Sequence, residues 1–599
     1  MTVLELKERP RNQQRSCARK KSGKLHKAGL VFLALLPVYI FILFEYIHFG
    51  IFAGIGEFLN LHIGAAFFSL ISLYTIYLIL FLISGRFIIA TLIMTLLCAL
   101  LAVSNYFKHT LTGDFVYPWD LIHNTGNLSE LRSFVSGSLP LGNILILLFG
   151  LLFIAVAVVI KGKLRLRARW RIGIIAVVAA IVTISFNTPQ HTSKTLQLFN
   201  MDLGSTSNQE VNHSENGFTG GFLVNTLSMN VPTPDGYSKN NIEKILQPYT
   251  ASLASAEFSS PDIIVILSES FWDPKNLPGV DFSKNPTANF DKISKKANAR
   301  SGYMYQTSYG GGTVRTEFDV ITGLTIEQMP DGSVPWQYLT GNIPSYASHF
   351  KDLGYRTIFM HTYEPSFYMR NKAYPFIGFD ELYFQDELTA IEGVDWHRSG
   401  LYIADDSFVS YVKHFLEQDN DNPCFLFGIS MENHQPYDNK YEDTKIKVSS
   451  KYLSESTRYA VEQFSEGLYR ADLALKKLVS YIDSRKKDTI LIYFGDHPPT
   501  LGPDKAAYIE SGFISDGFLN DKEWQALLRT PFLIYSNFSP EESEMLKPDA
   551  INEITSYNLI NAGLELAGAP KSAYMEFLTD YYRAIPYYNN CLKIQPTEE

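Results

Sequence analysis

Long apolar stretches dominate the first third of the chain, and each is close to the roughly 20 residues that a helix needs to cross a bilayer. They cover residues 28–48, 62–83, 86–105, 142–160 and 172–187. Beyond about residue 188, short apolar runs alternate with polar segments instead. The pattern predicts a membrane domain of five helices over 28–187, followed by a domain outside the bilayer.

Basic residues flank the predicted helices at two places. Residues 1–27 carry nine Lys and Arg, and the loop 161–171 carries six more. Basic segments stay on the cytoplasmic side, so five helices leave everything after about residue 188 outside the cell. The basic segment 1–27 is not a cleaved signal peptide, because four further apolar stretches follow the first. We therefore predict a multi-pass protein of the cell membrane with an extracellular carboxy-terminal domain.

The remainder of the chain divides at a change of composition. Residues 188–245 are rich in Asn, Ser, Thr and Gly, which predicts a linker with some helical pieces. Residues 246–599 alternate strand-like runs with helical patterns such as 459–484, which predicts an α/β domain with a mainly parallel central sheet. The expected strands are 262–267, 356–360, 424–429, 489–494 and 531–535.

Metal-ligating side chains follow two of these strands. Glu269 comes directly after the strand 262–267, and Asp496 and His497 come after the strand 489–494. Ligands gather at the carboxyl ends of the strands in open α/β sheets. The sequence therefore predicts a metal site at this edge, although a lone Asp-His pair also fits an ordinary turn.

Three glycines precede a predicted helix between those two strands. Gly310, Gly311 and Gly312 lead into Thr313, which falls near the helix amino terminus. Glycines permit close approach of a ligand, and free amides with the helix dipole favour an anionic phosphate. A flexible loop with a threonine cap is the plainer interpretation.

Two more polar clusters follow predicted strands. Arg370 belongs to the segment 361–372 after the strand 356–360, and His434 belongs to the segment 430–437 after the strand 424–429. Arg370 could grip a phosphate through two hydrogen bonds, and His434 could hydrogen-bond a phosphate or hydroxyl, or protonate a leaving oxygen. A surface arginine and a structural histidine are the competing interpretations.

Composition limits the remaining possibilities. The net charge is −9, and the basic residues concentrate beside the membrane helices, so nothing indicates nucleic-acid binding. The four cysteines, Cys17, Cys98, Cys424 and Cys591, imply no disulfide framework. Aromatic residues within 106–141 are typical of a connector at the membrane interface.

The ordered motifs resemble those of lipoteichoic acid synthases, which belong to the sulfatase and alkaline-phosphatase-like superfamily. The motifs are Ser-Glu-Ser-Phe with Glu269, Gly-Gly-Gly-Thr with Thr313, Phe-Tyr-Met-Arg with Arg370, Asn-His-Gln-Pro with His434, and Gly-Asp-His with Asp496 and His497. That family also has five membrane helices, a linker and an extracellular catalytic domain. The resemblance covers nearly the whole chain.

The resemblance implies a membrane phosphoglycerol transferase. Glu269, Thr313, Asp496 and His497 would hold Mn²⁺, with Mg²⁺ as the alternative. Thr313 would attack phosphatidylglycerol, release diacylglycerol and carry glycerol phosphate to an envelope acceptor, such as a lipoteichoic-acid-type polymer or a glycolipid. Further residues implied to bind the substrate are Arg370, His434 and Tyr368.

The chain departs from the family pattern at two places. Tyr368 stands where a tryptophan is common, and Val314 and Arg315 replace small and acidic residues after the nucleophile. Arg315 would either contact an anion or face solvent. These departures leave the acceptor open, and the oligomeric state is open as well.

Other functions of the same superfamily compete with this one. A phosphoethanolamine transferase also uses a threonine and a membrane domain, but its exterior domain usually carries several disulfides. A phosphodiesterase differs only in passing the intermediate to water. A non-catalytic membrane scaffold would be expected to lack a ligand or the nucleophile, and this chain has all of them.

Overall fold

The structure is a computed structural model, and it divides the chain into two compact units. The membrane unit comprises residues 1–110 and 114–230, and the α/β unit comprises residues 111–113 and 231–599. The structure describes residues 27–112, 115–118, 120, 139–160, 167–187, 189–201, 209–227, 235–250, 258–327, 329, 334–418, 422–516, 519–538 and 553–584. The predicted basic segment 1–27 therefore lies almost entirely outside the described residues.

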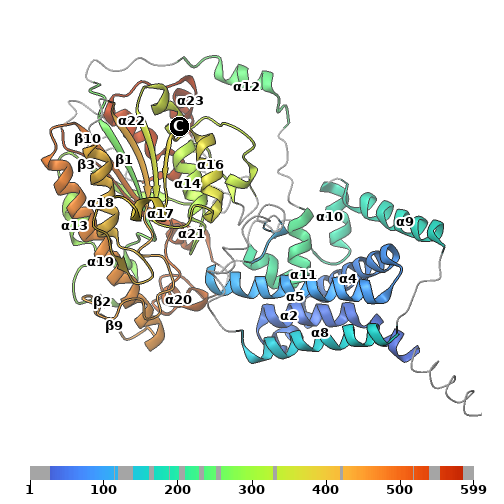
Figure 1. Cartoon of the computed structure of the whole chain (residues 1–599). Helices are drawn as coiled ribbons and strands as arrows, with labels where there is room; N and C mark the ends of the chain where they lie inside the picture. The colour runs from blue at the N-terminus through green and yellow to red at the C-terminus, as the bar shows by residue number, and fades with distance from the viewer. Residues whose placement is uncertain are drawn as a thin grey trace, which may run out of the picture. The chain divides into compact units, whose positions relative to one another are not determined.

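Five helices of the membrane unit are long and apolar enough to cross a membrane, among the residues described (Figure 1). They span Lys27–Phe49, Ile63–Ser84, Phe87–Thr110, Leu141–Ile160 and Ala168–Phe186. Within these spans lie α2 (Leu36–Phe49), α4 (Ile63–Ser84), α5 (Phe87–Thr112, which runs two residues further), α8 (Leu141–Ile160) and α9 (Ala168–Phe186), and the short α3 (Phe52–Leu61) precedes α4. Arg171 of α9 donates to the carbonyls of Leu82 and Ile83 at 2.5 Å each, so part of the second basic cluster caps the end of α4.

The segment 188–245 contains helical pieces, as predicted, but most of it belongs to the membrane unit and is not a linker. It contains α10 (Pro189–Gln197), α11 (Gln209–Leu227) and α12 (Lys239–Leu246), and the chain as far as residue 230 belongs to the membrane unit. Helix α11 packs against α2 and α4, with Phe218 and Val224 buried. Because α11 is rich in Asn and Gly, its composition predicted a linker and did not indicate this buried face.

The α/β unit is built on one eight-stranded sheet, in the order β12-β3-β11-β10-β1-β8-β4-β5. Its strands are β12 (Glu553–Thr555), β3 (Ala299–Tyr305), β11 (Arg529–Ser536), β10 (Thr489–Gly495), β1 (Asp262–Ser268), β8 (Cys424–Ile429), β4 (Arg356–His361) and β5 (Glu381–Tyr383). Only β11 runs antiparallel to its two neighbours in this sheet. The predicted fold class, five apolar helices followed by a domain with a mainly parallel sheet, is confirmed.

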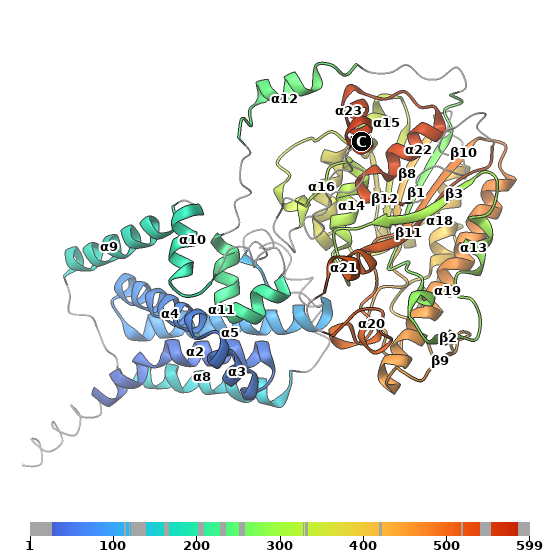
Figure 2. The same ribbon diagram turned by 180° about the vertical axis from the view of Figure 1, so that it is seen from behind.

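Helices cover both faces of the sheet (Figures 1 and 2). One face packs against α18 (Asp405–Glu417) and α19 (Glu455–Ser484), and the other against α14 (Thr313–Thr322), α15 (Tyr346–Asp352), α16 (Arg370–Ile377) and α22 (Leu559–Ala567). In β1, Ile264 and Ile266 face the first set while Ile263, Val265 and Leu267 face the second. A strand buried on both sides has a continuous apolar sequence, which explains the run that the sequence displays.

The strand register brings the polar segments to one edge of the sheet. Ser268 of β1 pairs with Gly495 of β10, and Leu267 pairs with Ile429 of β8. His361 at the end of β4 also pairs with Ile429. Because these strands are parallel, the residues that follow each of them meet at the same edge.

Candidate active site

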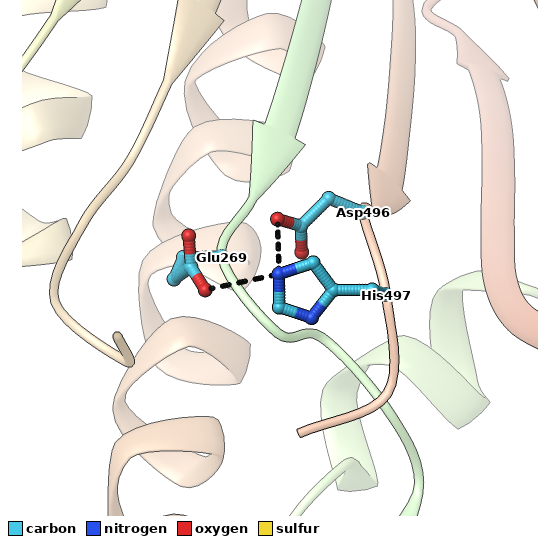
Figure 3. Close-up of side chains that lie close together, drawn as sticks. All are labelled: Glu269, Asp496 and His497. Atoms are coloured by element: carbon cyan, nitrogen blue, oxygen red, sulfur yellow. Dashed lines mark ion pairs between the residues drawn. The ribbon is translucent and has the colours of Figure 1, made fainter. Parts of the chain in front are cut away.

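Three buried side chains that could bind a metal ion converge at this edge (Figure 3). Glu269 leaves the end of β1, and Asp496 and His497 leave the end of β10, with their ligand atoms within 4.8 Å of one another. His497 Nε2 lies 3.2 Å from Asp496 Oδ2 and 3.8 Å from Glu269 Oε1. All three side chains are almost inaccessible to solvent. This is the grouping that the two strand ends predict.

The hydroxyl of Thr313 joins this group. Its Oγ1 donates to Asp496 Oδ2 at 2.7 Å and lies 3.5 Å from His497 Nε2. Thr313 is the first residue of α14, and Gly312 before it has φ +80°, a conformation that favours glycine. The glycine turn thus aims the threonine hydroxyl at the carboxylates.

Ser270 donates hydrogen bonds to the carboxylates of both Asp496 and Glu269. Its amide donates to Asp496 Oδ1 at 2.7 Å and its hydroxyl to Glu269 Oε1 at 2.8 Å. Ser270 has φ +51°, which costs a non-glycine residue about 1–3 kcal/mol and is common at functional sites. Sequence reasoning did not assign Ser270 a role, although it directly follows Glu269.

The ring of His497 is oriented for a ligand role. Its Nδ1 lies 3.1 Å from the carbonyl of Pro498, so Nδ1–H donates there and the lone pair of Nε2 faces the carboxylates. The donor set is two carboxylates, a hydroxyl and an imidazole. Mostly hard oxygen ligands suit Mn²⁺ or Mg²⁺, so these four residues fit a divalent cation of that class.

Electrostatics also favour a cation here. Burial and the neighbouring Glu269 carboxylate raise the pKa of Asp496 to about 6, against the opposing effects of His497, Thr313 and Ser270. Two buried carboxylates side by side repel each other. A positive ion between them would remove that repulsion.

Arg370 lies fully buried near this edge, at the start of α16. Its Nε and Nη2 contact both oxygens of Glu317 at 2.7–3.1 Å, and its Nη1 lies 3.1 Å from His361 Nε2. Burial lowers the pKa of Arg370, but Glu317 more than offsets this, so the pKa is raised. Arg370 is not a surface arginine, and a phosphate would meet it already paired with Glu317.

Tyr368 lies in a turn before Arg370 whose backbone is strained. Tyr368 and Met369 have φ +57° and +58°, two consecutive non-glycine residues in the left-handed region. The Tyr368 ring lies 5.2 Å from the Arg370 guanidinium carbon. Such strain persists only where surrounding contacts impose it, which marks this turn as a candidate substrate segment.

Glu317 is predicted to be a major determinant of stability in this region. It also accepts from Trp336 Nε1 at 2.8 Å and from the hydroxyl of Tyr374 at 2.5 Å. Glu317→Gln would leave the buried Arg370 charge uncompensated, at a cost of about 3–5 kcal/mol. The urea midpoint of the purified full-length chain should fall accordingly.

Asp406→Asn provides the control for that prediction. It breaks the exposed Lys477–Asp406 pair at 2.7 Å and should change stability by less than about 1 kcal/mol. Equal changes in the urea midpoint for the two substitutions would show that the buried Glu317–Arg370 pair contributes no more to stability than an exposed pair does.

His434 is a neutral imidazole beside the candidate metal ligands. Burial, followed by the charges of Lys440 and His497, lowers its pKa to about 4. The Gln435 hydrogen bond and the Asp496 carboxylate oppose this change and raise the pKa. His434 Nδ1 lies 2.8 Å from the carbonyl of Gln435 and 3.2 Å from the Tyr402 hydroxyl. At neutral pH it can therefore exchange hydrogen bonds with a substrate, but it is a poor acid for a leaving oxygen.

Lys440 supports the loop that carries His434. Its Nζ donates to the His434 carbonyl at 2.5 Å and lies 5.5–5.6 Å from the ring centres of Tyr402, Tyr437 and Tyr441. Burial lowers the pKa of Lys440 to about 7, opposed by Glu432, Glu269 and Asp405. No sequence motif indicated Lys440, because only the fold brings it beneath His434.

Arg315 does not face solvent, which removes one of its two predicted alternatives. It is 5% exposed, on α14 two residues after Thr313. Its charge lowers the pKa of the buried Asp319 carboxyl, although burial dominates and leaves that pKa well above its usual range. Arg315 thus acts on a carboxylate of its own helix.

These features define a candidate metal-dependent centre with a hydroxyl nucleophile, at the edge of a doubly covered sheet. Comparison with known proteins agrees: the family model described as sulfatase matches residues 261–569, about half of the chain. The chain belongs to the sulfatase family. The predicted resemblance to the sulfatase and alkaline-phosphatase-like superfamily is thereby confirmed, and with it an enzyme family.

Individual relatives cover different parts of the chain. A putative cyclic β-1,2-glucan modification protein from Rhizobium meliloti is 29% identical over 390 residues, 63% of this chain and 57% of the relative. The chain spans about half the length of the curated relatives it matches. The activity of the whole protein is therefore a matter of proposal.

Solved structures similar to this chain include transferases of two kinds. The phosphoglycerol transferase GacH from Streptococcus pyogenes, in complex with sn-glycerol-1-phosphate, has 22% identity and a TM-score of 0.49, covering 59% of this chain and 89% of that one. The phosphoethanolamine transferase EptA from Neisseria meningitidis, an integral membrane protein, has 12% identity and a TM-score of 0.53 over 92% of this chain and 98% of its own. The EptA match shows that the two chains share a fold over most of their length.

Proposed function

We propose that this protein transfers glycerol phosphate from phosphatidylglycerol to a glycan or glycolipid acceptor of the cell envelope. The observation that carries the proposal is the position of Thr313, whose hydroxyl lies 2.7 Å from Asp496 in a buried group with Glu269 and His497. The ordered motifs that resemble lipoteichoic acid synthases supply the donor. The name of the R. meliloti relative, a putative glucan modification protein, supports a carbohydrate acceptor.

The reaction begins at Thr313. Its hydroxyl gives up its proton to water, and its oxygen forms a bond to the phosphorus of the donor. The bond between phosphorus and the diacylglycerol oxygen breaks, and that oxygen leaves as a hydroxyl after taking up a proton. Glycerophosphoryl-Thr313 remains. An acceptor hydroxyl then loses its proton and bonds to the phosphorus, and the threonine oxygen leaves and takes up a proton.

Glu269, Thr313, Asp496 and His497 would hold the divalent cation, which when bound lowers the pKa of the threonine hydroxyl and neutralises charge on the phosphoryl oxygens. The resemblance implies that Arg370 binds the phosphate, and the Tyr368 ring contacts the Arg370 guanidinium. His434 would exchange a hydrogen bond with a glycerol hydroxyl, since its low pKa keeps it neutral. The chemistry takes place outside the cell if the basic segments set the orientation.

The cysteine content favours a phosphoglycerol transferase over a phosphoethanolamine transferase, whose exterior domain usually carries several disulfides. The exterior part of the sequence has only Cys424 and Cys591, too few for several disulfides.

The test is donor turnover by the purified full-length chain with Mn²⁺. We expect labelled phosphatidylglycerol to release diacylglycerol, and phosphatidylethanolamine under the same conditions to release little. Consumption of phosphatidylethanolamine instead would move the assignment to the phosphoethanolamine transferases. Release of free glycerol phosphate into water, with no transfer to any added glycan or glycolipid, would indicate a phosphodiesterase.

A further inference from the structure

Three histidines of the membrane unit gather around one phenylalanine, apart from the candidate active site. His48 lies in the last turn of α2, His109 in the last turn of α5, and His213 in α11. The Phe115 ring stacks on His213 at 3.9 Å and on His109 at 4.8 Å, and lies 5.4 Å from His48. We call His48, His109 and His213 the histidine cluster.

Two members of the histidine cluster carry buried nitrogens without a partner. Within the described part of the chain, the ring of the fully buried His213 has one hydrogen-bonding neighbour, the backbone of Gly217, and its other nitrogen has no partner. His48 Nε2 lies 3.2 Å from the His213 carbonyl, which leaves its buried Nδ1 without a partner. Each such nitrogen costs about 1–3 kcal/mol, so the cluster is not explained as a stabilising element.

The neighbouring polar side chains, in contrast, satisfy one another. Asn216 donates to Asn212 at 3.0 Å, and Asn212 donates to Asn225 at 3.3 Å. The Glu45 carboxylate accepts the amides of Phe218 and Thr219 at 2.9 and 3.2 Å, where Gly217 interrupts α11. Ionisable residues in membrane segments are costly and are functional by default. Among the described ionisable side chains of this region, His48 and His213 are each left with an unpartnered ring nitrogen.

The position of the histidine cluster indicates what it could bind. The first and third membrane spans, which contain α2 and α5, cross the membrane in the same direction. His48 and His109 lie at the carboxy-terminal ends of these two helices, on the same side of the membrane. The basic segments predict that this end is the outer face of the membrane, where phospholipid headgroups lie. A neutral imidazole offers one donor and one acceptor, which matches a headgroup with hydroxyls.

We infer that the histidine cluster binds the hydroxylated headgroup of a membrane phospholipid. The headgroup hydroxyls would pair with the nitrogens of His213 and His48, and Phe115 would hold the rings in place by stacking. The choice of phosphatidylglycerol as that lipid rests on the proposed function, whereas the binding site itself does not.

The test uses the full-length chain in detergent with Thr313→Ala, so that no turnover occurs. His213→Phe removes both ring nitrogens but keeps an aromatic ring against Phe115. We expect the Kd for short-chain phosphatidylglycerol to rise at least 10-fold. The melting temperature without lipid should stay the same or rise, because an unpartnered buried nitrogen disappears. His62→Phe, at the junction of α3 and α4 and outside the cluster, should leave the Kd unchanged.

Two results would overturn the inference. One is a His213→Phe chain that binds the lipid as tightly as the His62→Phe chain. The other is equal binding of short-chain diacylglycerol with the same loss in His213→Phe, since recognition would then reside in the acyl part. If the wild type turned over no phosphatidylglycerol while binding remained dependent on His213, the proposed function would fail and this inference would stand.

Discussion

Replacing Thr313 with alanine is expected to reduce diacylglycerol release from phosphatidylglycerol by at least about 1,000-fold, the scale on which removal of a nucleophile acts. The hydroxyl of Thr313 is the group that contacts both Asp496 and His497, at 2.7 and 3.5 Å. Alanine retains the helix start after Gly312 but has no oxygen to form the phosphoester. Initial rates with Mn²⁺ present would measure the effect.

Two control variants separate chemistry from folding in that experiment. Thr313→Ser keeps a hydroxyl at the same position and should retain measurable turnover. Thr322→Ala removes a buried threonine hydroxyl at the other end of α14, where it donates to the Phe318 carbonyl at 2.7 Å. Thr322→Ala should lower turnover little. If Thr313→Ala turned over the lipid as fast as Thr322→Ala, Thr313 would not be the nucleophile.

The second large effect is expected on metal binding. Glu269→Ala or His497→Ala should weaken Mn²⁺ affinity by more than the roughly 10–100-fold that loss of an outer-shell partner costs. Neither change should unfold the protein, since each removes a buried group that the metal-free centre does not need. Calorimetric titration with Mn²⁺ and a melting curve of the same full-length sample would measure both quantities.

His349→Ala is the matched control for the metal experiment. His349 is also partly buried in the α/β unit, but its ring contacts the carbonyl of Pro570 at 2.7 Å, away from the candidate site. We expect its Mn²⁺ affinity to equal that of the wild type. Unchanged affinity in both Glu269→Ala and His497→Ala would remove the proposed metal site.

Mn²⁺ affinity should also depend on pH in a direction that the site dictates. The pKa of Asp496 is raised to about 6, so protons compete with the cation as the pH falls below about 6. Glu269 contributes to that elevation. In Glu269→Gln the remaining pH dependence should therefore shift to lower pH.

The strands buried on both faces were predictable because their sequences are continuous apolar runs. All five predicted strands occur, and the three strands of the eight-stranded sheet that were missed, β3, β5 and β12, lie toward its edges. β3 reads Ala-Arg-Ser-Gly-Tyr-Met-Tyr and is only partly buried, and β5 and β12 have three residues each. Short or half-exposed strands lack the pattern on which the prediction depends.

The candidate ligands were predictable for a geometric reason, because residues that follow parallel strands meet at one edge. The pairing of Arg370 with Glu317 was not predictable, because the two residues are 53 positions apart and meet only in the folded core. The same holds for Lys440 beneath His434, and for α11, whose buried face belongs to the membrane unit. These features depend on long-range packing, which a local pattern does not encode.

The most direct test of the central claim is to locate the covalent intermediate. The purified full-length chain would be incubated with phosphatidylglycerol and Mn²⁺ without acceptor, quenched in acid, digested and analysed by mass spectrometry. The account predicts a glycerophosphoryl group on the peptide that contains Thr313, absent from Thr313→Ala. Diacylglycerol release with the group on another residue, or with an unmodified Thr313 peptide at every quench time, would contradict it.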